Sequence, residues 1–467
     1  MLVAAALVLA GWVLTNPVGG TPDELNHVLR AEAVGRGDLS GRPNPELAAV
    51  DAGVPLPKAC CDFDNPARLQ WVQRGARVVK VPAVLDFGTC FNRPTGFIAR
   101  CVEDGRGPVP PERLTTMGTQ EPAPYLWAGL ATRLAADPVA AVRWARAANA
   151  VVMLGLLGLA AWVLWSPAGA LAWAGLLAAV TPMVLFVGAS PSPSSLEIAG
   201  GICFAAALLR LARAPDQPAG TSVWVAVAIG GVALAASRSL GPVWVALDGG
   251  LVGALVGPRR LWRTVRAGGA RAAGAVVAVM VAGAGTAVWE LTRQPRIAFD
   301  GRFFVHQLRP SAYDLPRAAA EMVGAFGAVD VALPGAARLA WAVLVGALIA
   351  GALAAGTRRQ RLVVVATAAA AVTTTVLVSA ALLRQNGFEV QGRHVLAFAV
   401  LLPLLAGEVV HARHRAGRLP WLRPAVAVGI VAAVAVGVHL VALKTNVDHY
   451  ARTPDRAAPT ASPLPGR

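Results

Sequence analysis

The chain opens with MLVAAALVLAGWVLT (residues 1–15), which carries no charge, and continues with the polar segment NPVGGTPDELNHVLRAEAVGRGDL (residues 16–39). An uncharged run followed at once by polar and acidic residues is typical of a helix that crosses a bilayer and ends at its surface. No basic residues precede the run, and no A-x-A-like cleavage site follows it before TNPVGG. We therefore expect a retained helix rather than a secretory signal peptide.

The composition is that of a membrane protein. Of 467 residues, 56% are hydrophobic and only 15% are charged, whereas soluble domains carry about 25% charged residues. Apolar blocks of roughly 17 to 22 residues recur along the chain, which is the length that crosses a hydrocarbon core as a helix. The 48 glycines and 34 prolines are tolerated in membrane helices, where small residues let backbones approach closely. We predict an all-α polytopic membrane protein.

Hydropathy predicts about eleven transmembrane helices. They cover residues 1–15, 147–165, 168–188, 195–211, 221–236, 240–256, 272–291, 337–356, 362–383, 394–410 and 425–443. The chain is thus divided into a first transmembrane helix (1–15), a loop domain (16–146), transmembrane helices 2–7 (147–291), a second loop (292–336), transmembrane helices 8–11 (337–443) and a tail expected to be flexible (444–467).

Arginines are distributed unevenly between the two sides of this arrangement. With the N-terminus inside, the short cytoplasmic connections contain Arg210, Arg213, Arg259, Arg260, Arg263, Arg266, Arg271, Arg358, Arg359, Arg361, Arg413, Arg415, Arg418 and Arg423. The short opposite loops contain only Arg238, Arg384 and Arg393. The positive-inside rule therefore supports an orientation in which residues 16–146, the second loop and the tail are extracytoplasmic.

The same bias explains why 42 Lys+Arg exceed 26 Asp+Glu. No basic cluster is interleaved with aromatic residues in a soluble module, so we expect no nucleic-acid partner. The high content of alanine, glycine, arginine and valine is typical of a GC-rich bacterial genome. We expect a multi-pass protein of the bacterial plasma membrane.

Four of the five cysteines, Cys60, Cys61, Cys90 and Cys101, lie in the first loop, and Cys203 lies in a predicted span. An even number of cysteines in an extracytoplasmic loop favours disulfides. Adjacent cysteines would form a strained ring, so each of the first two is expected to pair with one of the last two, which leaves two connectivities. A metal site is the alternative, but the C-x-x-C spacing of zinc hairpins is missing.

The segment TPDELNHVLRAEAVGRGDL (residues 21–39) predicts an amphipathic helix at the membrane surface. Thr21 is expected as the N-cap, Pro22 as the first helical residue, and Glu24 as the residue that closes a capping box. Apolar residues between 25 and 33 then form one stripe.

Asp23 lies about eight residues beyond the first span, so its carboxylate stays within ~28 Å of the membrane and can reach a lipid headgroup. The alternative is that Asp23 and Glu24 only favour the helix N-terminus through the helix dipole, by about 0.3 to 1 kcal/mol. His27 follows on the same face, and the three side chains could hold a divalent metal. The stretch has no recognised metal spacing, however. We expect a surface histidine bonded to an acidic neighbour; a divalent metal stays an open alternative without a supporting motif, and no cofactor is assigned.

Further polar residues lie near predicted span ends. Glu121 and Tyr125, four residues apart, are expected on one helix face and could line an acceptor groove. Ordinary interfacial anchoring by Tyr125 and Trp127 is the favoured interpretation. Glu197 lies near the extracytoplasmic end of a span, where an acidic residue needs a partner or a water-filled cavity. Arg238 is the candidate partner.

Several segments resemble domain-of-unknown-function family 2142, whose polytopic membrane proteins are similar to the GT-C glycosyltransferases. The first span is followed by P-D-E and a nearby histidine, and the further similar segments are EPAPYLWAGLATRL (121–134), VGASPSPSSLEIAGG (187–201), MVGAFGAVDVALP (322–334) and VQGRHVLAFAVLLP (390–403). The chain has Ser192-Pro193 where Asn-Pro is more usual, and His394 where the family commonly has tyrosine. The resemblance covers nearly the whole chain.

This resemblance implies a GT-C-like fold with a small extracytoplasmic domain in the first loop. It implies an inverting membrane glycosyltransferase that moves a sugar from a polyprenyl-phosphate carrier to an extracytoplasmic glycan or lipid acceptor. Asp23 matches the acidic residue of the first external loop and would act as the general base, with Glu24 in support. The residues expected to line the substrate are His27, Glu121, Tyr125, Glu197, Gln391 and His394.

In this chemistry the leaving lipid phosphate needs fixed cations. Arg238, Arg384 and Arg393 are the candidates, because the planar guanidinium donates two hydrogen bonds to phosphate at once. The alternative is that these arginines only extend from span ends to the headgroups.

Two other functions stay open. A transporter or lipid flippase predicts ionisable residues deep within spans and an internal repeat; Asp248 is the clear mid-span charge, and we find no repeat. A non-catalytic protein that binds a polyprenyl lipid is the third. The chain has no P-loop, no G-x-S-x-G elbow and no dinucleotide fingerprint, which argues against an ATP-driven pump, a hydrolase of that type and a Rossmann enzyme.

Overall fold

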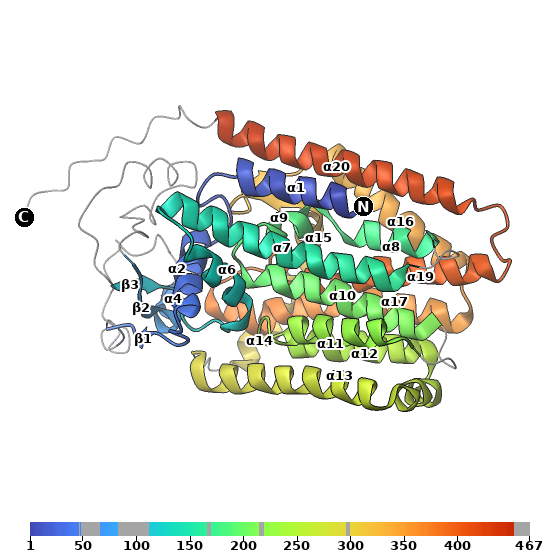
Figure 1. The fold of residues 1–467 in the computed structure, drawn as a ribbon, viewed down its shortest axis with the longest axis horizontal. Coiled ribbons are helices and arrows are strands. Elements are labelled where there is room, and N and C mark those ends of the chain that lie inside the picture. Colours follow the sequence, from blue (N-terminus) through green and yellow to red (C-terminus); the bar gives the residue numbers. More distant parts are fainter. Residues whose placement is uncertain are drawn as a thin grey trace, which may run out of the picture.

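The structure is a computed structural model that describes residues 1–45, 47, 66–82, 112–165, 170–213, 219–295 and 299–452. Long helices lie side by side along one direction and form the body of the molecule (Figure 1). The first half of the chain contributes α1 (Leu2–Thr15), α2 (Glu24–Gly35), β1 (Arg42–Pro43), α4 (Pro66–Gly75), β2 (Arg77–Lys80), β3 (Glu112–Thr115), the 3₁₀ helix η3 (Ala123–Tyr125), α6 (Leu126–Thr132), α7 (Pro138–Leu164), α8 (Ala170–Ala179), α9 (Pro182–Gly188), α10 (Pro193–Arg213) and α11 (Thr221–Ala235).

The second half contributes α12 (Gly241–Val256), α13 (Pro258–Arg293), α14 (Gly301–Tyr313), α15 (Leu315–Gly324), β4 (Ala325–Phe326), β5 (Val331–Ala332), α16 (Gly335–Ala355), α17 (Arg358–Val378), the π-helical turn η4 (Ser379–Leu383), the 3₁₀ helix η5 (Arg384–Asn386), α18 (Arg393–Ala399), α19 (Leu401–Arg415) and α20 (Pro424–Arg452). The all-α class is confirmed.

Within the described ranges, seven helices are long and apolar enough to cross a membrane, and the bent pair α8–α9 makes an eighth if it is one span. Three of the predicted spans, α1, α11 and α12, have only 14, 15 and 16 residues. A crossing normally needs about 20. The polytopic architecture is therefore confirmed, but the count of eleven is not.

Two boundaries differ from the prediction. The helix that contains the second predicted span, α7, begins at Pro138, before the predicted start of the span at residue 147, because Asp137 accepts the N–H of Ala140 and caps the helix. α20 continues to Arg452 and includes the first residues of the predicted tail. The four loop cysteines lie outside the described residues, and Cys203 is a buried free thiol.

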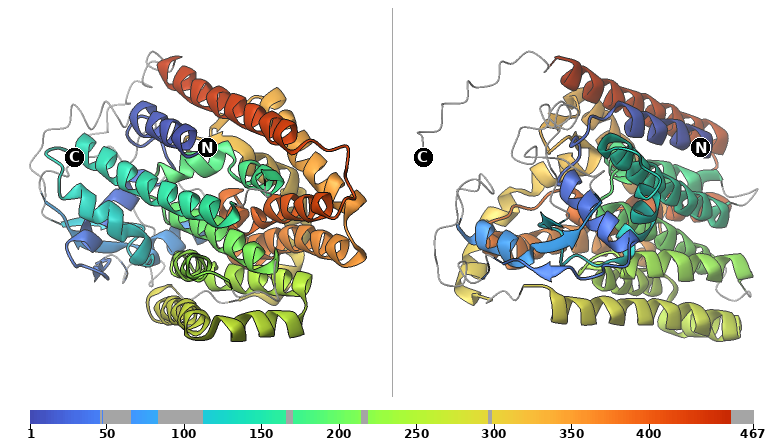
Figure 2. Two further views of the ribbon diagram at one scale, coloured as in Figure 1. Left: turned by 45° about the vertical axis from the view of Figure 1, so that its right-hand side comes forward. Right: turned by 60° about the vertical axis from the view of Figure 1, so that its left-hand side comes forward.

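A small layer lies at one end of the bundle, at the left of Figure 1. β1, β2 and β3 form an antiparallel sheet in that order, with Val78 opposite Leu114. α2 and α6 pack beside it on the start of α7 (Figure 2). We call this end of the molecule the sheet end.

α2 and α6 cross at two glycines. A Cβ at Gly35 would lie 2.2 Å from the carbonyl oxygen of Gly129, and a Cβ at Gly129 would lie 2.0 Å from that of Ala31. Because real Cβ atoms essentially never come so close to a backbone oxygen, only glycine fits at both positions.

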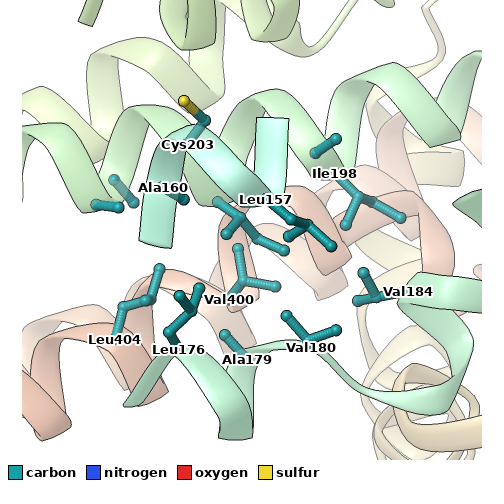
Figure 3. Close-up of a cluster of buried hydrophobic side chains, with 14 of the residues drawn as sticks. Leu157, Ala160, Leu176, Ala179, Val180, Val184, Ile198, Cys203, Val400 and Leu404 are labelled. Atoms are coloured by element: carbon teal, nitrogen blue, oxygen red, sulfur yellow. The ribbon is translucent and has the colours of Figure 1, made fainter. Parts of the chain in front are cut away.

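The core of the bundle surrounds α10 and the α18–α19 pair. Their most apolar stretches are 78% and 83% buried inside the protein. Figure 3 shows side chains from several helices meeting there, among them Leu157, Leu176, Ile198 and Leu404. α10 and α18 approach closely, since a Cβ at Gly201 would lie 2.4 Å from the Ala397 carbonyl oxygen. These helices therefore form a rigid base for the turns at their ends.

Candidate functional site

The connection between α1 and α2 does not form the predicted capping box. α2 begins at Glu24 rather than at Pro22, and Asp23 is its N-cap residue. The hydroxyl of Thr21 accepts a hydrogen bond of 3.1 Å from Ser190 instead of capping the helix. The prediction was wrong because the Glu24 side chain is bound by a residue distant in sequence.

That residue is Arg146 on α7. Its Nε and Nη2 atoms donate to the two carboxylate oxygens of Glu24 at 2.6 Å each, and the Gly19 amide donates to Glu24 at 2.7 Å. Arg146 also donates to the carbonyl oxygens of Asn16 (2.6 Å) and Pro17 (2.7 Å). Both charged side chains are buried, so this bidentate pair fixes the turn before α2.

Asp23 lies on this fixed turn in an unusual conformation. Its φ of 57° and ψ of 20° are left-handed, and its carboxylate makes no cap hydrogen bond to α2. An aspartate N-cap normally has extended backbone angles and accepts a hydrogen bond from the first turn. Here the side chain is 51% exposed and lies 3.9 Å from Nη2 of Arg393.

Arg393 is the first residue of α18, and its side chain is only 10% exposed. Its contact with Asp23 is an ion pair that is too long for a direct hydrogen bond. Among the residues that the structure describes, its guanidinium donates no hydrogen bond. The donors of this nearly buried cation are therefore available for an anion.

Two contacts place the backbone of Arg393. The amide of Gly392 donates to Oε2 of Glu321 at 2.8 Å, and Oε1 of Glu321 accepts from Arg317 at 3.0 Å. A Cβ at Gly392 would lie 2.5 Å from the carbonyl oxygen of Ala318, so α15 packs directly on this turn. α15 thus packs against the start of α18 and fixes its position.

Arg238 lies in the turn between α11 and α12 on the same site. Its Nη1 donates to the Ser194 hydroxyl at 3.0 Å and lies 4.0 Å from Oε2 of Glu197. The other carboxylate oxygen of Glu197 accepts from Trp244 at 3.0 Å. Arg238 is therefore the partner expected for Glu197, although the two charges are not in direct contact.

The loose geometry of these two arginines contrasts with other ion pairs in the described structure. Arg213 and Glu408 are 2.7 Å apart, and Arg384 and Asp314 are 2.6 Å apart. Arg384 also lies 3.4 Å from Gln307 of α14. The guanidinium of Arg384 is thus bound by Asp314, between α14 and α15, and by Gln307, whereas Arg238 and Arg393 lie at the site that contains Asp23.

His27 lies one turn after Asp23 and is not the surface residue that we expected. It is 5% exposed, and its Nδ1 lies 2.7 Å from the hydroxyl oxygen of Tyr125. Burial, and then the charges of Arg393 and Arg238, lower the pKa of His27 to about 3. The imidazole is therefore neutral at physiological pH.

Tyr125 is fully buried, so the expectation that it anchors the protein at the interface was wrong, whereas Trp127 is 49% exposed. Burial raises the pKa of Tyr125 above its ordinary value. Glu121 precedes η3 and shares no helix with Tyr125. Sequence spacing could not show this, because the helical segment begins only at Ala123 with η3, after Glu121, and then continues directly into α6.

Glu121 is 3% exposed, and neither of its carboxylate oxygens has a hydrogen-bond partner among the described residues. Burial, and then the carboxyl group of Glu290 near the end of α13, raise the pKa of Glu121 well above its ordinary value. Burial and the neighbouring carboxyl group thus both favour the protonated form of Glu121.

Gln391 and His394 flank Arg393. The amide of Gln391 lies 3.3 Å from Nδ1 of His394, and the side-chain oxygen of Gln391 is buried without a partner in the described part of the chain. Both residues therefore lie beside the turn that carries Arg393.

The described residues contain no group of three or more His, Cys, Asp or Glu side chains arranged to hold a metal ion. Of the three side chains considered for a metal, Glu24 is bound by Arg146 and His27 by Tyr125. Sequence reasoning missed Arg146 and Glu321. An arginine directly before a predicted span was the available signal for Arg146, but its partner lies 122 positions away.

Comparison with known proteins gives three results. No curated protein matches the chain. One solved structure, described as the crystal structure of ArnT from Cupriavidus metallidurans in the apo state, is 15% identical, with 96% of this chain and 76% of that chain covered at a TM-score of 0.46. A match at this level does not extend to activity or substrate. The sequence profile described as "Predicted membrane protein (DUF2142)" matches residues 6–402, and the chain therefore belongs to the DUF2142 family of membrane proteins.

Proposed function

We propose that the protein is a membrane glycosyltransferase that moves a sugar from a polyprenyl-phosphate carrier to a glycan or lipid acceptor. The observation that carries the proposal is the pairing of Asp23 with Arg393. A half-exposed carboxylate faces a nearly buried guanidinium at 3.9 Å, and that guanidinium donates no hydrogen bond to the described residues. A base for the acceptor and a cation for the leaving phosphate would thus lie side by side.

In the proposed reaction, Asp23 accepts the proton of an acceptor hydroxyl. The hydroxyl oxygen forms a bond to the anomeric carbon of the donor sugar, and the bond between that carbon and the phosphate oxygen breaks. The electron pair of the broken bond stays on the polyprenyl phosphate. A positioned general base contributes roughly 10²- to 10⁴-fold to such a step, and direct displacement inverts the anomeric centre.

Arg393 and Arg238 would bind the phosphate and stabilise the charge that it gains as the bond breaks. His27, also at the site, is neutral because burial and these two arginines lower its pKa to about 3. It therefore adds no positive charge beside Asp23, and the carboxylate stays available as a base.

The position of Asp23 in the chain supports a lipid-linked donor. Asp23 follows α1, an apolar helix that ends at Thr15, so its carboxylate lies within ~28 Å of the end of that helix even along an extended chain. We propose that the sheet end faces the extracytoplasmic side of the bacterial plasma membrane, where the acceptor is found.

The test is substitution of Asp23 in a strain whose envelope glycans are profiled. Asp23→Asn keeps the size of the side chain but removes the base, and product formation is expected to fall by roughly 10²- to 10⁴-fold at normal protein levels. Asp137→Asn is the matched control, because Asp137 is an exposed helix cap and asparagine is also a good cap. Undiminished product in Asp23→Asn would remove Asp23 from the mechanism.

A lipid transporter or flippase is the second candidate, and Asp248 is the observation that favours it. Asp248 lies within α12, is fully buried, and has no hydrogen-bond partner for either oxygen among the described residues. Such a residue in an apolar helix often belongs to an ion or substrate pathway. If Asp248→Asn abolished lipid translocation in vesicles while Asp23→Asn did not, transport would replace sugar transfer as the assigned function. If the protein bound polyprenyl phosphate but showed neither turnover nor translocation, it would be assigned as a lipid-binding protein.

A further inference from the structure

The helix α13 is divided by Gly269, whose φ of 54° and ψ of −134° are not helical. Residues 258–268, PRRLWRTVRAG, therefore form a separate helical segment. Figure 1 shows its turns end-on at the lower right, whereas the rest of α13 runs across the view. We call residues 258–268 the α13 foot. It lies at the end of the bundle opposite the sheet.

The inner side of the α13 foot packs on the bundle. Leu261 and Thr264 line a small apolar pocket together with Leu208 and Val252. Gly268 lies against Trp224, since a Cβ at this glycine would be 2.7 Å from the indole ring. The foot is thus held in place by apolar contacts on one side.

The outer side is basic. Arg259, Arg260 and Arg266 are exposed, and none of their side chains forms an ion pair or a hydrogen bond with the residues that the structure describes. In contrast, the nearby Arg359 is used structurally, because it donates to the carbonyl oxygens at the end of α12 at 2.6 and 3.2 Å. The foot contains no acidic residue that could neutralise its arginines.

Exposed tryptophans mark the depth of the foot in the membrane. Trp262 on the foot is 64% exposed, and Trp165 after α7 and Trp421 before α20 are 59% and 73% exposed. α7 ends and α20 begins at the end of the bundle opposite the sheet (Figure 1). Because tryptophan is enriched at the boundary between lipid and water, these residues indicate that the foot lies at that boundary.

We propose that the α13 foot lies in the headgroup layer of the bilayer and binds anionic phospholipid headgroups. Because its apolar side packs on the bundle and its exposed arginines lie beside the exposed Trp262, the foot presents fixed positive charge at the level of the headgroups. Each arginine near an anionic surface contributes about 1 kcal/mol, which is about a fivefold change in affinity. This binding is independent of the proposed sugar transfer.

The experiment uses the purified full-length protein in detergent micelles, titrated with dioleoylphosphatidylglycerol or dioleoylphosphatidylcholine. The thermal unfolding midpoint gives the apparent affinity for each lipid, and hydrogen–deuterium exchange follows residues 258–268. The variant is Arg259→Gln/Arg260→Gln/Arg266→Gln. The control, Arg133→Gln/Arg143→Gln/Arg302→Gln, removes the same charge from three exposed positions elsewhere. A further arm adds free glycerol 3-phosphate at the same concentration.

We expect phosphatidylglycerol, but not phosphatidylcholine or free glycerol 3-phosphate, to protect residues 258–268 from exchange in the natural protein. The foot variant should bind phosphatidylglycerol more weakly by about fivefold for each arginine removed, and the difference should shrink at high salt. Unchanged affinity in the foot variant, an equal loss in the control, or equal protection by free glycerol 3-phosphate would each overturn the proposal. The exchange measurement on the natural protein does not depend on how the variants fold.

Discussion

The backbone of Asp23 determines where its charge points. A non-glycine residue in the left-handed region costs about 1 kcal/mol, although aspartate tolerates it better than most residues. The structure maintains this conformation because Arg146 binds the side chain of Glu24, the next residue, and also the Pro17 carbonyl oxygen earlier in the same connection. The same torsion directs the carboxylate away from α2 and toward Arg393.

Substitutions at Asp23 should separate stability from activity. Glycine adopts a φ of 57° without a Cβ clash, which favours the folded state, but its greater freedom in the unfolded chain favours unfolding. Because these two effects oppose each other, we expect the stability of Asp23→Gly to stay within about 1 kcal/mol of that of the natural protein. Asp23→Ala should be less stable than Asp23→Gly by about 1 kcal/mol. Both should lose transfer activity. Thermal unfolding in detergent compares the stabilities of the two variants. A higher unfolding midpoint for Asp23→Ala than for Asp23→Gly would contradict the conformational argument.

Between elements, α15 supports the start of α18. Glu321 binds the Gly392 amide at 2.8 Å, and Gly392 has no room for a Cβ beside α15. The hydroxyl of Thr181, at the bend between α8 and α9, donates to the Met322 carbonyl oxygen at 2.7 Å. Through these contacts, the segment between α13 and α16 holds the turn that carries Arg393.

Glu321 is therefore expected to be a positioning residue. Glu321→Gln keeps an oxygen that can accept the Gly392 amide proton, whereas Glu321→Ala removes it. Hydrogen exchange of residues 390–394 should increase in the alanine variant and stay near the natural rate in the glutamine variant. Glu408→Gln is the control, since it weakens the buried pair with Arg213 without touching this turn. Equal exchange rates of residues 390–394 in the two Glu321 variants would show that Glu321 does not position this turn.

The sequence predicts where the helices lie along the chain better than it predicts which helices and side chains contact one another. The spans of α7 and α10 follow from local apolar runs, and the all-α class follows with them. The bend of 66° between α8 and α9 was missed because the apolar run continues through Thr181 and Pro182. At the site, no pattern along the chain could show that Asp314 binds Arg384 while Arg393 keeps its donors free, because these contacts join residues far apart in sequence.

At the scale of the whole molecule, buried ionisable groups link stability to pH. The pKa of His27 falls from 6.5 to about 3 on folding, so between these values the unfolded chain binds a proton that the folded protein does not, and stability decreases as the pH falls. Burial and Glu290 raise the pKa of Glu121. The folded protein therefore keeps a proton that the unfolded chain loses, and stability decreases as the pH rises above the ordinary glutamate value.

Thermal unfolding midpoints between about pH 4 and pH 9 should show both effects. His27→Gln removes the titrating imidazole, so the decrease below about pH 6.5 should become shallower. Glu121→Gln removes a group whose stabilising contribution is lost as the pH rises above its ordinary pKa of 4.5, so the decrease in stability with rising pH should become shallower from that value upward. If the unfolding midpoint falls equally steeply below about pH 6.5 in His27→Gln and in the natural protein, groups other than His27 cause the loss of stability in acid.

The crossing of α2 and α6 at Gly35 and Gly129 has a consequence for protein engineering. Because the two backbones touch with no side chain between them, neither helix can be exchanged for a homologous one that carries even a methyl group at this point. In a chimaera with another member of the family, residues 16–36 and 123–132 would have to be transplanted together as one module, and donors for such grafts can be selected by these two positions alone.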